Sequence, residues 1–192
     1  HLFNEAHHNA AGTICVNRVP FQRVGGFGSI SVESMPDRKD YEDDDAYYDN
    51  LTAWYMRFME DNTIALKTLR VNGFREKRPW YRDPKLSDED VLQKVALSNI
   101  NNSSIYVFRA SSLARLLPML TKKQTDEQKK ANQNPAPLIP DMYVPGGPAL
   151  FSDFGSHVFE WMQKQSGEFP LFAFFIPESA NWRDAGEPEE LR

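Results

Sequence analysis

Alternation of apolar and polar positions marks several short strands along the chain. In residues 28–34, Ile30 and Val32 alternate with polar side chains, and a period of two is typical of a strand with one buried face. The run over residues 171–176 is apolar throughout and predicts a central strand buried on both faces. Further strands are predicted over residues 13–19, 64–71 and 103–109.

Two longer segments repeat apolar residues at spacings of three and four, which predicts amphipathic helices with one buried face. The first covers residues 46–60, and its apolar positions are Tyr47, Leu51, Trp54, Tyr55, Phe58 and Met59. The second begins near residue 151, and its apolar positions are Phe151, Phe154, Val158, Trp161 and Met162. Gly167 is suited to the turn that ends this second helix.

Two further helices are predicted from residues that can cap a helix. Ser87 to Asp90 resembles a capping box, and the helix after it is expected to run to about Leu97. Ser111 and Ser112 are expected to cap a helix that continues to about residue 120.

These elements predict an α/β (α+β) domain in which a mixed sheet of about five strands is covered by about four helices. Residues 13–176 form this single domain, between a flexible N-terminal segment (1–12) and a C-terminal tail (177–192). A linker rich in proline and glycine is expected at residues 132–148.

Composition narrows the class of protein. Of the 192 residues, 41% are hydrophobic and 26% are charged, which suits a folded domain rather than a disordered chain. The net charge of −5 does not attract polyphosphates, so nucleic acid is not expected as a partner. No apolar run approaches the roughly 20 residues that span a bilayer, so no membrane span is predicted.

Candidate chemistry is sparse. Cys15 is the one cysteine and lies in an apolar stretch, so a buried thiol is expected. The aspartates of residues 37–45 lack the spacing of a calcium loop, and the glycines of residues 25–28 precede a strand rather than a helix. We therefore assign no catalytic residue and expect no cofactor and no metal site.

Two apolar groups are candidates for binding another protein. Trp80 and Tyr81 lie in a loop that also carries several arginines and lysines. Met142, Tyr143 and Val144 form a short apolar patch between prolines, which restrict the unbound chain and reduce the entropy lost on docking. The same patch could instead fasten the loop to its own core, and folded-back aromatics in a solvated loop remain the simpler interpretation of Trp80 and Tyr81.

The layout of residues 46–176 resembles the adaptor proteins that accompany lipase effectors of bacterial type VI secretion. The similar places are residues 58–62 at a helix end, residues 104–109 before a helix, and the Trp161 helix leading to a strand that ends at Pro177. The resemblance implies a non-enzymatic protein that binds a secreted effector.

The function expected from the sequence is therefore protein binding, as an adaptor or an immunity-like partner of a bacterial secreted effector. A cytoplasmic location is expected, or a periplasmic one if the chain, which begins at His1, has lost an upstream anchor or signal. Two alternatives stay open. One is a hydrolase with a scattered active site that uses His157 or His7 and His8, and the other is a structural domain of a larger assembly.

Overall fold

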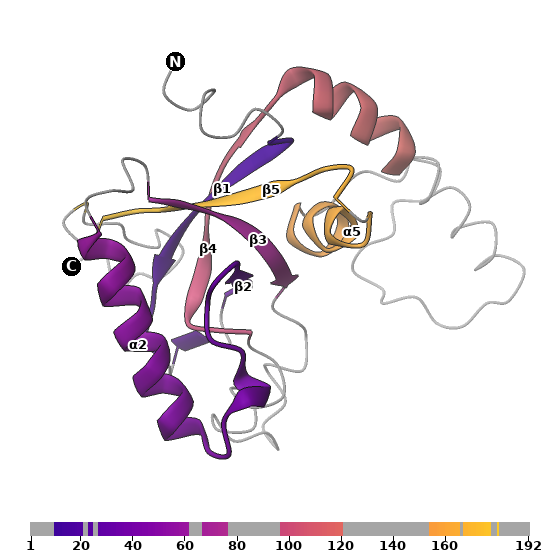
Figure 1. The fold of residues 1–192 in the computed structure, drawn as a ribbon. Helices are drawn as coiled ribbons and strands as arrows, with labels where there is room; N and C mark the ends of the chain where they lie inside the picture. The colour runs from indigo at the N-terminus through magenta and orange to yellow at the C-terminus, as the bar shows by residue number, and fades with distance from the viewer. Residues whose placement is uncertain are drawn as a thin grey trace, which may run out of the picture.

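Five strands form one mixed sheet at the centre of the molecule (Figure 1). A computed structural model describes residues 10–20, 23–24, 27–61, 67–76, 97–120, 154–165, 167–177 and 180. The strands are β1 (Gly12–Arg18), β2 (Ser29–Val32), β3 (Thr68–Arg75), β4 (Ile100–Phe108) and β5 (Leu171–Phe175). Each overlaps a strand predicted from the sequence, so the mixed five-stranded sheet is confirmed.

The sheet curls into a closed barrel with the strand order β1-β4-β2-β3-β5. β1 runs parallel to β5, and every other neighbouring pair is antiparallel. The closure between β2 and β4 is short, because their register contains the single pair Ser29 and Asn101. Beyond it, the Asn102 N–H donates to the Gly28 carbonyl at 2.9 Å. Strand patterning had not indicated this closure.

Where the backbone pairing of β2 with β4 ends, serine hydroxyls form further hydrogen bonds between β2 and the segment before β4. Ser98 Oγ donates to the Ile30 carbonyl at 2.5 Å and accepts from the Ile100 N–H at 2.9 Å. Ser29 Oγ accepts from the Leu97 N–H at 3.0 Å. Because buried backbone groups are costly without partners, these bonds hold the segment before β4 against β2.

Helix α2 (Asp44–Glu60) packs Tyr55 and Phe58 of its apolar face against Phe175 of β5. Asp43 caps its first turn by accepting from the Ala46 N–H at 2.7 Å. Leu51, Tyr55 and Phe58 are buried as predicted, and the Phe58 ring lies 4.8 Å from that of Phe175. Trp54, which was predicted to be core, is only half-buried at the edge of this cluster.

A second helical segment consists of a π-helix, η5 (Phe154–Phe159), followed directly by α5 (Glu160–Gln163). In Figure 1, α5 lies on the other side of the strands from α2. Val158, Trp161 and Met162 are buried, as the stripe predicted, whereas Phe154 of the same stripe is 38% exposed. Phe159 is also fully buried, although it lies off that stripe. A π-helix bonds each residue to the one five positions away, so the facing residues differ from those of an α-helix.

A third helix covers residues 110–120 and buries Leu116 and Leu120. Its first helical bond runs from the Leu113 N–H to the Arg109 carbonyl at 3.0 Å. Ser111 and Ser112 therefore lie within the first turn, and the prediction that they cap the helix was wrong.

The described residues thus contain three helices apart from short 3₁₀ turns such as η2 (Arg38–Asp40), not the four that were predicted. The helix predicted between Ser87 and about Leu97 lies almost entirely outside the described residues. None of the described helices is both long and apolar enough to cross a membrane.

Candidate functional site

The residues proposed from the sequence as protein-binding candidates lie outside the described residues. This applies to Trp80 and Tyr81 and to Met142, Tyr143 and Val144. It also applies to the first nine residues, with His7 and His8, and to the side chain of His157. These assignments, and the linker at residues 132–148, remain predictions.

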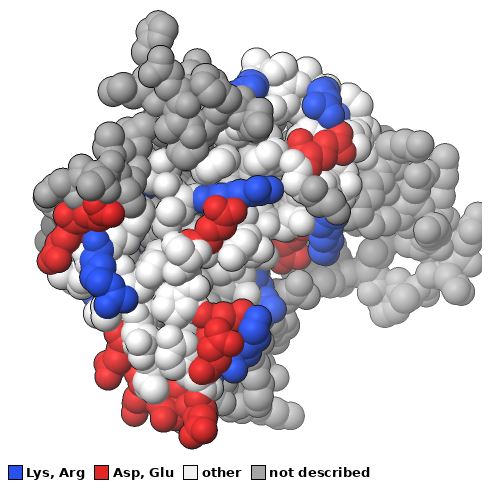
Figure 2. Space-filling model, in the orientation of Figure 1, with Lys and Arg blue, Asp and Glu red and all other residues white. Residues whose placement is uncertain are grey.

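The acidic loop before α2 has structural roles in the described part of the chain. Asp43 caps α2, and Asp37 caps η2 by accepting from the Lys39 N–H at 3.2 Å. Asp44 pairs with Arg38, with Nε and Oδ1 2.5 Å apart. Figure 2 shows acidic side chains gathered at this end of the molecule. Among the described residues, no group of histidine, cysteine, aspartate or glutamate side chains is arranged to hold a metal ion.

Cys15 lies in β1, flanked by the buried Ile14 and Val16. Partial burial raises the pKa of its thiol above the usual 9.0, because the thiolate would lose hydration. The thiol therefore stays protonated near neutral pH, whereas a nucleophilic cysteine needs a lowered pKa.

The outer face of β4 exposes two aliphatic side chains. Ile105 is 49% exposed and Val107 is 56% exposed. Tyr106 and Phe108, which alternate with them, pack inward on Phe159 at ring distances of 5.0 and 6.1 Å. Residues 105–108 of β4 are all apolar, so this stretch has two apolar faces. Within the described part of the chain, the face of Tyr106 and Phe108 is the one that packs against the core.

The outer face continues from β4 to β5 through Thr13 of β1, a polar residue that is only 5% exposed. Val107 pairs with Thr13 of β1, and Thr13 pairs in turn with Phe172 of β5. Directly paired residues project to the same face of a sheet, and the Phe172 side chain is half-buried. We call Ile105, Val107 and Phe172 the outer apolar row.

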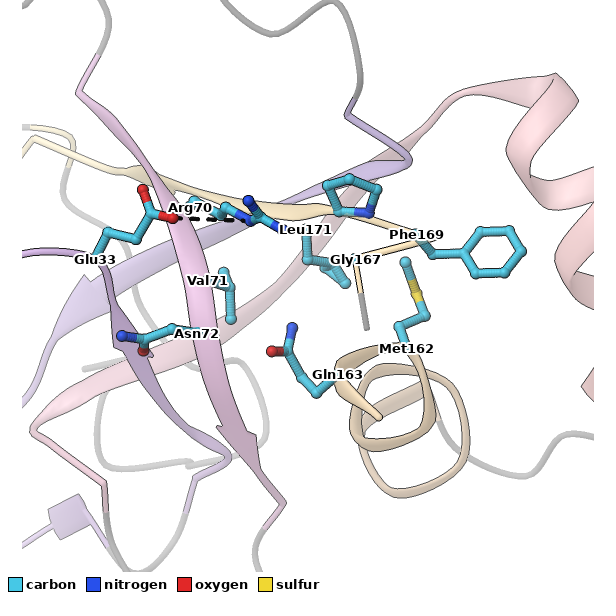
Figure 3. A pocket seen from close by; sticks show the side chains of 10 residues that line it. Glu33, Arg70, Val71, Asn72, Met162, Gln163, Gly167, Phe169 and Leu171 are labelled. Carbon is cyan, nitrogen blue, oxygen red and sulfur yellow. Dashed lines mark ion pairs between the residues drawn. The ribbon is translucent and has the colours of Figure 1, made fainter. Parts of the chain in front are cut away.

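A separate hollow of about 200 Å³ lies between β3, α5 and the turn before β5 (Figure 3). Its walls include the apolar side chains of Val71, Met162 and Leu171. Ligand pockets for whole small molecules usually have volumes of about 300–1,000 Å³. This hollow is therefore sized for one side chain or a short organic group.

Four polar side chains surround the hollow: Glu33, Arg70, Asn72 and Gln163. The Arg70 Nε lies 3.8 Å from the Glu33 carboxylate, and these side chains are 45% and 56% exposed. Asn72 donates from Nδ2 to the Val32 carbonyl at 3.3 Å, which fixes its amide beside the hollow. The described residues of this lining offer charge and hydrogen bonds, and none of them is a serine, cysteine or histidine that could act as a nucleophile or a neutral base.

Sequence reasoning missed both surfaces for identifiable reasons. The strand predicted over residues 103–109 overlaps β4, but the consecutive apolar residues 105–108 do not indicate which of its two faces packs against the core. The hollow joins residues 33, 70 and 163, which are far apart in sequence and meet only through the barrel. Gly167 was the one indication, since it was predicted in the turn after the helix.

In comparisons with protein-family models, curated proteins and solved structures, no match was found.

Proposed function

We propose that this protein is a non-enzymatic protein-binding domain, acting as an adaptor or immunity-like partner of a bacterial secreted effector in the cytoplasm. The observation that carries the proposal is the outer apolar row. Ile105 and Val107 expose about half of their surface on one strand face. These two side chains are neighbours on one strand, and adjoining exposed apolar groups mark interaction sites more often than isolated ones do.

The sequence resemblance to effector adaptors gives the proposed partner its class. The segment of residues 104–109 that carries part of that resemblance also carries Ile105 and Val107. An effector surface with a complementary apolar patch would bury these two side chains. Their half-exposed surface corresponds to about 1 kcal/mol each when it is removed from water.

The test is binding to the product of the neighbouring effector gene, since an adaptor is expected to be encoded beside its effector. We would purify the wild type and an Ile105→Ser, Val107→Ser double variant and measure the Kd by calorimetry. Loss of about 2 kcal/mol corresponds to a Kd roughly 30-fold higher for the double variant.

Met56→Ser is the matched control, because Met56 is 46% exposed and lies on α2 rather than on β4. It should change the Kd by less than twofold. Thermal melting of all variants should remain close to the wild type, since exposed substitutions usually change stability by about 0.5 kcal/mol or less. Equal binding by the double variant and the wild type would refute the role of this face.

A further inference from the structure

We infer that the hollow beside Arg70 is a binding site for a carboxylate group. The inference concerns a different surface from the outer apolar row and holds whether or not that row binds a protein. It rests on the Arg70 guanidinium, on the amide of Gln163, and on the shape of the space between them (Figure 3).

The Arg70 guanidinium is placed for binding and makes no direct hydrogen bond with any of the described residues. Its one charged neighbour in the described structure, Glu33, lies 3.8 Å from Nε, which is too long for a hydrogen bond. No described residue accepts a hydrogen bond from the terminal nitrogens. A guanidinium presents two parallel N–H groups that match the two oxygens of a carboxylate.

The turn before β5 keeps space beside this guanidinium. Gly167 has a φ of +86°, and a Cβ atom at this position would lie 3.1 Å from Arg70 Nη2. A side chain here would be strained by the backbone and crowded against the guanidinium. Glycine therefore leaves the terminal nitrogens accessible from the hollow.

Gln163 supplies a second donor on the opposite side of the hollow. It is the last residue of α5, and Figure 3 shows its amide directed from that helix toward β3. Its side chain makes no hydrogen bond with the described residues. One carboxylate could thus accept from Arg70 and from Gln163 Nε2.

The apolar walls fix the kind of carboxylate that fits. Val71, Met162 and Leu171 line the hollow between the polar groups. They would contact the methylene groups of an acid while its charged end meets Arg70. Both the side chain of a glutamate in another polypeptide and a short free dicarboxylate have this chemistry.

Glu33 limits the affinity of the site. Its negative charge lies beside Arg70 and would repel an incoming carboxylate. Solvent and salt weaken this repulsion only in part. Removing this charge while preserving the side-chain shape should strengthen binding. Removing the charge of Arg70 should abolish it, so the two substitutions have opposite expected effects.

The experiment is an NMR titration of the full chain, following the Arg70 Nε–H and Gln163 amide signals at fixed ionic strength. The probes are N-acetyl-glutamate N-methylamide, the matching glutamine compound, and glutarate. We expect saturable millimolar binding of at least one acid and at least tenfold weaker binding of the neutral glutamine compound. Tighter binding of the peptide-like acid indicates a polypeptide ligand, and tighter binding of glutarate indicates a small free acid.

The variants are Glu33→Gln, Arg70→Gln and Arg70→Lys, with Arg57→Gln on α2 as a control for overall charge. Glu33→Gln should lower the Kd two- to fivefold, Arg70→Gln should raise it at least tenfold, and Arg70→Lys should fall between the wild type and Arg70→Gln. Arg57→Gln should leave it within twofold. The inference would be overturned if the glutamine compound bound as tightly as the acids, or if Arg57→Gln weakened binding as much as Arg70→Gln. Signals that do not saturate with either acid would overturn it as well.

Discussion

Gly12 and Phe108 face each other across the pairing of β1 with β4, and the Phe108 ring occupies the place of a side chain at residue 12. A Cβ atom on Gly12 would lie 2.7 Å from Cδ1 and 2.8 Å from Cε1 of that ring. The ring also contacts Phe154 and Phe159, at centroid distances of 5.7 and 6.1 Å. It therefore has little room to move.

Gly12→Ala should lower the free energy of unfolding by about 1–3 kcal/mol, the usual cost of overpacking a core. Urea denaturation of the purified protein measures this change. Combining Gly12→Ala with Phe108→Leu should cost less than the sum of the two single changes, because the smaller side chain makes room for the methyl group. Strict additivity would show that the close approach is not what destabilises the first variant.

Trp54→Ala should destabilise the protein less than Phe58→Ala does. Trp54 is half-buried and stacks on Phe58 with ring centroids 5.7 Å apart, whereas Phe58 is buried against Phe175. We expect about 1–3 kcal/mol for Trp54→Ala and about 3–5 kcal/mol for Phe58→Ala, again from urea denaturation. Met56→Ala on the exposed side of the same helix is the control and should change stability by about 0.5 kcal/mol or less. The reverse order would place Trp54 in the core.

The strands were predictable because each has a local apolar pattern, whereas their ends depend on pairing. The third strand was predicted to end at residue 71, before Asn72 and Gly73, yet β3 continues to Arg75. Gly73 pairs with Ser31 and Val71 pairs with Val32, so Asn72 is the extra residue of a bulge. A turn-forming dipeptide and a bulge have the same local composition, and only the partner strand distinguishes them.

Contacts between distant residues account for most of what the sequence did not predict. Barrel closure depends on Ser98 and Ser29, whose small polar side chains are equally common in surface loops. In the same way, the hollow needs Arg70 and Gln163 to meet across the fold. Burial of Phe159 depends on π-helical winding. The period of 3.6 residues used for the prediction assumes an α-helix, so it does not place Phe159 on the buried face.

Tyr47 should make the protein less stable in alkaline solution. Its hydroxyl donates to the Leu97 carbonyl at 3.0 Å, and its side chain is buried at the start of α2. Burial raises the pKa of this hydroxyl above its usual 10.0, and the nearby Tyr48 and Asp37 raise it further. A tyrosine in the unfolded chain loses its proton at about pH 10. Above that pH the folded state therefore holds a proton that the unfolded state has released.

The free energy of unfolding then falls as the pH rises, because the unfolded state binds fewer protons. One such group contributes a slope of at most about 1.4 kcal/mol per pH unit above pH 10. Urea denaturation at several pH values should show this decline in the wild type and a shallower one in Tyr47→Phe. The variant should also lose about 1 kcal/mol at neutral pH with its hydrogen bond. The raised pKa of the Cys15 thiol also lowers the free energy of unfolding as the pH rises above about 9. Cys15→Ala removes this contribution and leaves that of Tyr47. Identical slopes in the wild type and Tyr47→Phe would exclude Tyr47 as the group responsible.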